Sequence, residues 1–366
     1  MSTTSLPARN SAPPAPQRIL RRVFSFPVAI ACSLAVLAEL SARGRLNDPD
    51  MWWHLKLGEA IWTKHSVPRV DLFSFTALHH SLVPQEWLSQ LLVYMAYRLD
   101  GYAGLMLWIC VLATALFVVG YALSSLYSGN SKIGLLGALV LWLFSTSGMS
   151  IRPQMIGYLL LAVELLVLYM GWSRSPRWLL CLPPLFAVWV NCHGSFILGL
   201  IVLGVILACS FFGFRKGSLV SVPWDSRRRR ILMLALALSG GAVFLNPVGW
   251  RQVWYPLDTM LHQPVNLSFV QEWQPLPLQD ARGIGLLCVL ALICLVLLFR
   301  RTQVLYLHEL VLLGMGTWMA LNHRRLVFVF GILAAPVVAR LCSDFWDRYD
   351  AEKDRPLPNV IFIGLV

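Results

Sequence analysis

Long apolar runs dominate the chain, and within them apolar and polar residues do not alternate. A run that approaches the roughly 20 residues needed to cross the hydrocarbon core predicts a membrane span. Lipid tolerates helices and closed barrels, and the missing two-residue period favours helices. We therefore predict an all-α polytopic membrane protein with about ten transmembrane helices. These are expected to begin near Val23, Tyr102, Ile133, Met155, Trp178, Phe196, Ile231, Gly283, Val304 and Leu326.

Basic residues gather in alternate loops between these spans. Because Lys and Arg favour short cytoplasmic loops, this side is predicted to be cytoplasmic, together with the N-terminus. The composition, 57% hydrophobic and 13% charged, fits a protein integral to the inner (cytoplasmic) membrane. The orientation signal accounts for the net charge of +12, so no nucleic-acid partner is expected. The basic residues are Arg18, Arg21, Arg22, Arg174, Arg177, Arg300, Arg301 and those between 215 and 230.

Three regions follow from these patterns. Residues 1–17, rich in Pro, Ser and Ala, are predicted to be a disordered cytoplasmic tail. Residues 18–345 are predicted to form the transmembrane domain, and residues 41–101 are its large extracytoplasmic, catalytic loop. Residues 346–366 end in an apolar run that looks like the start of a further span, so one interpretation is a truncated chain. The eight cysteines form no CxxC pair, and no glycine-rich phosphate motif is present, which argues against a zinc site or nucleotide binding.

The first outer loop begins with an unusual polar sequence, DPDMWWHL at residues 48–55. Asp48 before Pro49 is typical of a helix start, in which Asp48 accepts free backbone N–H groups. Asp50 and His54 are then four residues apart on one helix face, where an acid and an imidazole can bind a metal or share general-base work. The structural alternative is that Asp50 only favours the positive helix end and His54 is a wet interfacial residue. Trp52 and Trp53 suit a helix lying in the headgroup region.

A second short helix is predicted from Pro84 through Glu86 to Leu99, ending at a break at Gly101. Residues 68–76 between the two helices combine turn residues with alternating aromatics, which predicts an ordered loop. Glu86 adds a second acid to Asp50, and paired carboxylates with different pKa values are common in proton-transfer chemistry. Alternatively, Glu86 is only a first-turn helix charge.

The remaining polar clusters fall on the same predicted outer side as this loop. They lie at residues 152–154, 191–194, 246–282 and 322–325. Polar groups at helix ends on one face of a bundle can converge on a single cavity, and ionisable residues at the membrane boundary are candidates for function. The alternative for each cluster is an ordinary solvated loop. We expect one active centre at the outer face.

These residues also carry a family resemblance. The segments DPDMWWHLKLGEAIW, VPRVDLFSFT, QEWL, NCHGSFILGL, NPVGWRQVWYPL, QEWQ and NHRR, in this order from Asp48 to about Pro336, resemble a bacterial membrane-protein family of the GT-C glycosyltransferase type. That family is similar to protein O-mannosyltransferases and lipid A aminoarabinose transferases. The resemblance implies a GT-C-like fold and transfer of a sugar from a polyprenyl-phosphate carrier to an acceptor at the outer face. It implies that an aspartate of the first loop, Asp50 or Asp48, is catalytic, although Asp-Pro-Asp replaces the Asp-Glu pair of the O-mannosyltransferases.

The chemistry implied by this resemblance needs a base for the acceptor hydroxyl and positive charge for the leaving phosphate. Asp50 is the expected base, and His54 or Glu86 would assist it or ligate a divalent ion such as Mg²⁺ or Mn²⁺. His193 is a secondary candidate, with helix-end capping as the alternative. The acceptor could be a glycan, a lipid or a protein.

Arg324 and Arg325 are candidates for the phosphate because they oppose the orientation signal at the outer end of a span. Arg324, which directly follows His323, is the favoured one. The alternatives are contact with lipid phosphates or pairing with a carboxylate such as Glu272. Trp273, like Trp250 and Trp254, could stack on a sugar ring, although tryptophans of this kind commonly form the interfacial belt.

Two other functions remain open from the sequence. A polyprenyl-glycan transporter should carry ionisable residues near mid-span and a repeated half, and little of either is evident. An accessory subunit could retain the GT-C fold without activity, which an early chain end would favour.

Overall fold

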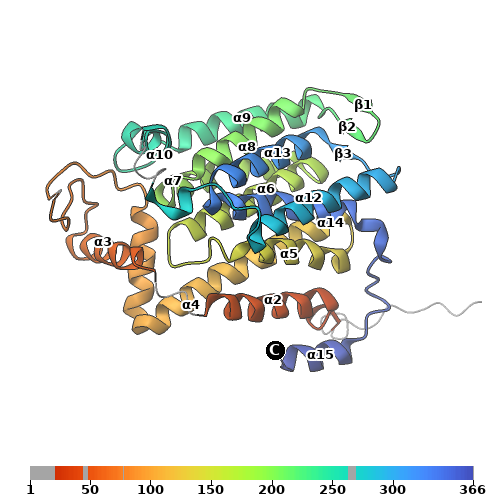
Figure 1. Ribbon diagram of the computed structural model, residues 1–366, viewed down its shortest axis with the longest axis horizontal. Coiled ribbons are helices and arrows are strands. Elements are labelled where there is room, and N and C mark those ends of the chain that lie inside the picture. Colours follow the sequence, from red (N-terminus) through yellow and green to blue (C-terminus); the bar gives the residue numbers. More distant parts are fainter. Residues whose placement is uncertain (1–20, 44–47, 77, 263–268, 366) are drawn as a thin grey trace, which may run out of the picture.

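The computed structural model describes residues 21–43, 48–76, 78–262 and 269–365, so the predicted tail at residues 1–17 lies outside the described residues. Within them the chain forms a bundle of helices, most of which run along one common direction (Figure 1). The α-helices are α2 (Phe26–Ala42), α3 (Asp50–Lys64), α4 (Trp87–Ser128), α5 (Ser131–Ser145), α6 (Gln154–Ser173), α7 (Leu182–Cys192), α8 (Phe196–Cys209), α9 (Ser226–Ala242), α10 (Trp250–His262), α12 (Ala281–Phe299), α13 (Leu307–Asn322), α14 (Val327–Leu341) and α15 (Pro356–Leu365). Short 3-10 helices are η1 (Pro176–Cys181), η2 (Gln271–Trp273), η3 (Arg324–Leu326) and η4 (Ser343–Phe345).

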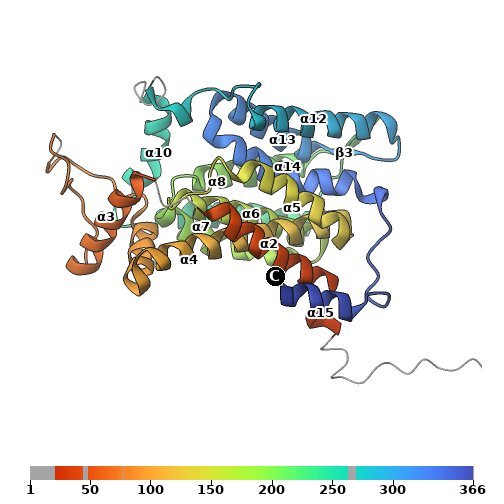
Figure 2. The same ribbon diagram turned by 60° about the horizontal axis from the view of Figure 1, so that its bottom comes forward.

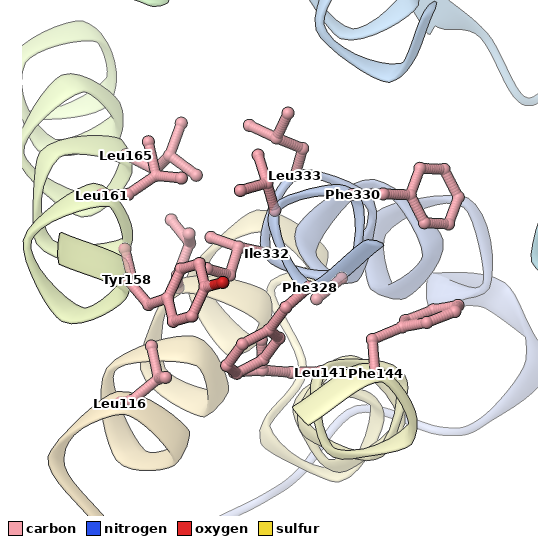
Figure 3. Packing of buried hydrophobic residues seen from close by; sticks show 14 of the residues in the cluster. Leu116, Leu141, Phe144, Tyr158, Leu161, Leu165, Phe328, Phe330, Ile332 and Leu333 are labelled. Carbon is pink, nitrogen blue, oxygen red and sulfur yellow. The ribbon is translucent and has the colours of Figure 1, made fainter. Parts of the chain in front are cut away.

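Helix α14 is the centre of the bundle. Nearly all its side chains are buried, as expected for a helix that is apolar on every face. It packs against α4, α5 and α13, and Figure 3 shows its Phe328 and Ile332 among apolar side chains of α4, α5 and α6. Gly331 is required for the close contact with α5, because an added Cβ would lie 2.9 Å from the Phe144 ring. This core holds the helix ends, and therefore the loops between them, in fixed positions.

A helix lies at or near each of the ten positions at which a span was predicted. Among the described residues, three helices are long and apolar enough to cross a membrane, namely α4, α6 and α12. Helices α2, α5 and α8 are apolar but shorter, and a 15-residue helix such as α5 is only about 22 Å long at 1.5 Å per residue. A mostly helical architecture with apolar helices is therefore supported, although a small sheet makes the predicted all-α class inexact, and the number of spans remains a prediction.

Helix α4 bends where the sequence predicted a break. Asp100 has φ −159° and ψ 45°, and Gly101 has φ 51°, a left-handed conformation that glycine adopts readily. The first part of α4 runs across the end of the bundle, and the second part runs along it (Figures 1 and 2). The predicted short helix ending before Gly101 is thus confirmed, and it lies beside α3.

The two ends of the bundle differ in chemistry. The site end holds α3, α10 and the polar clusters at residues 152–154, 191–194 and 322–325 (Figure 1). The basic end holds a small sheet of β1 (Phe214–Lys216), β2 (Leu219–Ser221) and β3 (Leu305–Tyr306), in which β1 and β2 are antiparallel and β2 and β3 parallel. Arg215 lies in β1, and Arg300 and Arg301 precede β3. The predicted separation of polar and basic loops is therefore present in space, and the compartment that each end faces remains a prediction.

One acid, Glu164, lies in the middle of a predicted span. Glu164 lies in the middle of α6 and is fully buried, and neither of its carboxyl oxygens has a hydrogen-bond partner in the described part of the chain. Gly199 of α8 makes room for it, since an added Cβ would lie 2.9 Å from Oε2 of Glu164. A lone acid inside an apolar run gives only a weak sequence signal, because its surroundings depend on packing.

The described part of the C-terminal segment, residues 346–365, returns to the start of the bundle. In α15, Asn359 donates a side-chain hydrogen bond to the carbonyl of Phe24 at 2.9 Å, and the carboxylate of Asp354 accepts the N–H of Phe26 at 2.7 Å. The segment therefore packs against the N-terminal end of α2 rather than extending alone.

Single cysteines at Ser66 and Ser226 test the sidedness of this architecture. Both positions are exposed, Ser66 after α3 and Ser226 at the start of α9. In a background that lacks the exposed Cys181, Cys288 and Cys294, a membrane-impermeant maleimide added outside intact cells should label Ser66→Cys and not Ser226→Cys. Labelling of both after permeabilisation is the control. If both react in intact cells, the predicted topology is wrong.

Candidate functional site

The start of α3 is fixed by an ion pair between Asp48 and Arg152. Both carboxylate oxygens of Asp48 accept hydrogen bonds from the guanidinium, at 2.6 Å from Nε and 2.9 Å from Nη2. Asp48 also accepts the backbone N–H of Asp50 at 3.1 Å, but the helix begins at Asp50 and its N-cap is Pro49, so Asp48 lies one residue before the N-cap position that the sequence predicted for it. Burial alone would raise the pKa of Asp48, but the hydrogen bonds and charge of Arg152 outweigh it and lower that pKa. Asp48 is therefore a weak base.

Arg152 joins two further carboxylates to Asp48. Its Nη2 lies 3.0 Å from Oδ2 of Asp50, and its Nη1 lies 3.1 Å from Oε1 of Glu272. The Arg152 side chain is 22% exposed and that of Asp50 is 55% exposed, so Asp50 is the member of this group most open to a ligand. Burial opposes the charge on Arg152, but these carboxylates raise its pKa and keep it protonated.

Glu86 meets His193 beside this group. Glu86 is the N-cap of α4, and the neighbouring Trp87 and Ser89 fasten this helix to the end of α7 through hydrogen bonds to Asn191 and Cys192, both 2.7 Å long. As a result, Nε2 of His193 lies 3.5 Å from Oε1 of Glu86. The structure thus brings together two site residues that are distant in the sequence.

Ser195 sets which nitrogen of His193 carries the proton. The Ser195 backbone N–H points to Nδ1 of His193 at 3.1 Å, and the Ser195 hydroxyl lies 2.8 Å from the same atom. Because the backbone N–H can only donate, Nδ1 must accept, and the hydroxyl, which itself accepts the Trp189 indole N–H at 3.0 Å, donates to the same nitrogen. Nδ1 is therefore an acceptor, and the proton is on Nε2, facing Glu86. Burial lowers the pKa of His193 to about 3, so the ring is neutral at physiological pH.

Burial sets the proton affinity of Glu86. Its side chain is 19% exposed, and desolvation raises its pKa to about 7 although the charges of Arg325 and Arg152 act in the opposite direction. A carboxyl with a pKa near neutral pH can both accept and release a proton at little cost. Among the predicted acids, Glu86 therefore has the proton affinity best suited to general-base or general-acid work.

His54 contacts Gln90 rather than Asp50, its predicted partner in binding a metal. Only 7% exposed, it has Nδ1 3.4 Å from the amide nitrogen of Gln90, and burial lowers its pKa to about 4. No contact joins His54 to Asp50 in the residues that the structure describes. In the same residues, no group of three or more His, Cys, Asp or Glu side chains could hold a metal. An Mg²⁺ or Mn²⁺ requirement therefore remains a prediction.

Arg324 and Arg325 lie in different surroundings. Arg325 donates to Oε1 of Gln154 at 2.7 Å, and its guanidinium carbon lies 4.8 Å from the centre of the Trp273 ring. Arg325 also lies 3.5 Å from Glu272, whereas Arg324 pairs with Asp280 at 3.6 Å. Arg325 is therefore the arginine that is linked, through Glu272, to Arg152 and its other carboxylates.

A polar pocket of about 140 Å³ adjoins these arginines. Its lining contains three guanidinium groups and one carboxylate, together with an amide and a hydroxyl. The residues are Ser147, Gln271, Glu272, Arg282, Arg324 and Arg325. The pocket is large enough and basic enough for a phosphate group.

Other sequence candidates lie apart from this centre. Trp250 and Trp254 of α10 form an exposed stack with Phe244, with ring centres 6.1 Å apart in each pair. Sequence reasoning noted the 152–154 cluster without giving Arg152 a role, and it missed Ser195. Arg152 could have been found by the argument applied to Arg324, because it also is an outer arginine at the start of a span.

Comparison with known proteins identifies a similar fold among solved structures. Neither a family model nor a curated protein matches the chain. Among solved structures, the oligosaccharyltransferase of Archaeoglobus fulgidus, tethered to an acceptor peptide, matches with a TM-score of 0.55 and 13% identity. The match covers 88% of this chain and 50% of that enzyme. The GT-C-like fold implied by the sequence resemblance is therefore supported, and the chain spans about half the length of that enzyme.

The raised pKa of Glu86 predicts a pH-dependent gain in stability for Glu86→Gln. An unfolded glutamate ionises near its ordinary pKa of 4.5, whereas folded Glu86 ionises near 7. Folding is therefore penalised progressively as the pH rises from 4.5 to 7, and fully above 7. Glu86→Gln should raise stability at pH 8 by on the order of 1–3 kcal/mol, and by almost nothing at pH 4.5.

Thermal unfolding of purified protein across this pH range measures the effect. Glu59→Gln is the matched control, because Glu59 is an exposed acid on α3 paired with Lys56. Equal effects of Glu86→Gln at both pH values would contradict the buried, raised-pKa assignment.

Proposed function

We propose that this protein transfers a sugar from a polyprenyl-phosphate-linked donor to an acceptor at the extracytoplasmic face of the membrane. The observation that carries the proposal is the joining of an acid cluster, Asp48, Asp50 and Glu86, to an arginine-lined pocket at one end of the bundle. The GT-C-like fold is a second support. The acceptor is a hydroxyl group of a glycan, a lipid or a protein.

The proposal gives one role to the acids, which bind and deprotonate the acceptor, and another to the arginine-lined pocket, which binds the donor. Asp50 receives the acceptor hydroxyl, because its carboxylate is the most exposed of the cluster and has one ion-pair partner, Arg152. Glu86 lies beside it with a pKa suited to taking up the proton. His193 directs its Nε2–H to Glu86 and so orients that carboxylate. No step is assigned to a metal, because Arg152 already pairs with both aspartates of the loop and His54 faces Gln90.

The pocket beside the acids accounts for the donor. Departure of the sugar leaves negative charge on the phosphate, which guanidinium groups stabilise by bidentate hydrogen bonds. Arg325 is favoured over Arg324 for this role, because it lines the pocket and its charge also acts on Glu86. The Arg325 guanidinium packs over the Trp273 ring in a cation–π contact that helps to hold it in place.

Asp50→Asn should abolish sugar transfer while leaving the protein folded. The amide keeps the side-chain volume, but it neither pairs as an anion with Arg152 nor offers the acceptor hydroxyl a charged hydrogen-bond acceptor. Turnover by purified protein with polyprenyl-phosphate sugars is the measurement, and thermal unfolding checks the fold. Asp258→Asn on α10 is the control, since Asp258 pairs with His262 and, among the described residues, has no ion pair with the cluster. Retained turnover in Asp50→Asn would remove Asp50 from the mechanism.

Lysine variants of the two arginines separate their roles. Arg325→Lys should weaken donor use by roughly ten- to a hundredfold, because an ammonium cannot reproduce the guanidinium fork. Arg324→Lys should have a smaller effect. Donor affinity and turnover are measured for both. A larger loss in Arg324→Lys would restore the assignment favoured by the sequence, and unchanged values in both would detach the pocket from the donor.

A further inference from the structure

A second pocket lies at the basic end, at the opposite end of the bundle from the acid cluster. Its wall contains an unbroken series of aromatic contacts: Tyr127 to Tyr169 with ring centres 4.5 Å apart, Tyr169 to Trp172 at 6.0 Å, and Trp172 to Tyr306 at 6.1 Å. Trp224 is a further lining ring. Tyr306 already has the Arg340 guanidinium 4.8 Å from its ring centre and the lining imidazole of His308 stacked on it at 5.7 Å, so the rings of Tyr127, Tyr169, Trp172 and Trp224 remain for a ligand.

Three of the hydroxyl groups in this pocket already donate their hydrogen to backbone carbonyls. Ser210 donates its hydrogen to the carbonyl of Leu207 at 2.6 Å, Ser221 to that of Phe212 at 2.9 Å, and Tyr169 to that of Leu126 at 2.7 Å. Each hydroxyl has one hydrogen and two lone pairs, so these three oxygens present lone pairs alone. A ligand with N–H donors matches them.

The backbone around the pocket also favours positive charge. Tyr127, Trp172 and Cys209 lie in the last turns of α4, α6 and α8, so three helices end at the same pocket. The C-terminal end of a helix carries partial negative charge, and aromatic faces attract cations. The nearby Arg340 is neutralised by its ion pair with Glu309 and does not reverse this preference.

Size restricts the cation further. The cavity has a volume of about 30 Å³, and one water molecule needs roughly 10–15 Å³ on this measure. The cavity therefore takes two or three non-hydrogen atoms. That is enough for a primary ammonium and the carbon next to it, and too little for a trimethylammonium group.

We propose that this pocket binds the primary ammonium group of an ethanolamine phospholipid. Exposed basic residues at the same end, Arg174 at the end of α6 and Arg215 in β1, can receive the lipid phosphate while the ammonium enters between the rings. The site is independent of the proposed sugar transfer.

Lipid retention by the full-length protein tests the source of the ammonium. Native mass spectrometry after exchange into mixed micelles with equal phosphatidylethanolamine and phosphatidylcholine should show preferential retention of phosphatidylethanolamine. Trp224→Leu should reduce this preference by roughly two- to fivefold, the worth of one cation–π contact. The control Trp178→Leu, an exposed tryptophan outside the pocket, should not change it. Equal retention of the two lipids by the wild type would overturn the assignment to ethanolamine lipids.

Ligand-observed NMR on the wild-type protein tests the ammonium chemistry itself. Ethylammonium should show saturation transfer, whereas 1-propanol, which lacks the charge, and tetramethylammonium, which lacks N–H groups, should show far less. Ser221→Ala should weaken the ethylammonium signal by removing an acceptor, while Ser343→Ala at the same end should not. Equal signals from 1-propanol or tetramethylammonium would overturn the proposal. Because the wild-type comparison needs no variant, a misfolded variant cannot conceal that result.

Discussion

The guanidinium of Arg152 organises the site end of the bundle. It contacts carboxylates from the start of α3 and from the segment before α12, while its own residue directly precedes α6. Without it, Asp48, Asp50 and Glu272 would repel one another in a partly desolvated space, where removal of one partner of an ion pair is costly. The three segments therefore depend on one cation for their relative positions.

The same cation divides the acids by their chemistry. Asp48, held by two hydrogen bonds from Arg152, is kept ionised and fixed, while Asp50 retains an exposed carboxylate. In the described part of the chain Glu86 has no hydrogen bond to Arg152, and burial is the largest influence on its pKa. Three carboxyl groups of similar intrinsic acidity thus have different surroundings, which is how a single centre can hold a fixed anion, an accessible anion and a proton acceptor.

The bend at Gly101 makes this arrangement possible. It lets the first part of α4 run across the end of the bundle, where Trp87 and Ser89 attach it to the end of α7 and place Glu86 against His193. Gly58 of α3 packs so closely on this part of α4 that an added Cβ would lie 2.3 Å from the carbonyl oxygen of Gln90. The acid cluster is consequently built on packed helices, which hold a site more precisely than free loops.

The sequence by itself determined the helical class, the approximate starts of the helices, the break at Gly101 and the division of polar and basic loops between two ends. These features depend on local apolar runs, on glycine conformation and on charge in short loops, all of which can be read within a few residues. It also named Asp48, Asp50, Glu86, His193 and Arg325, and it offered Glu272 as a partner for the arginines, which Arg325 does contact, but it did not give the partners of the acids. Tertiary structure alone decided that Arg152 pairs with Asp48 and Glu272, 104 and 120 residues away in sequence. It also decided that His54 contacts Gln90 and that Glu164 is buried with no hydrogen-bond partner among the residues that the structure describes. Such contacts arise from the packing of distant helices, and no local pattern in the chain encodes which side chains that packing will bring together.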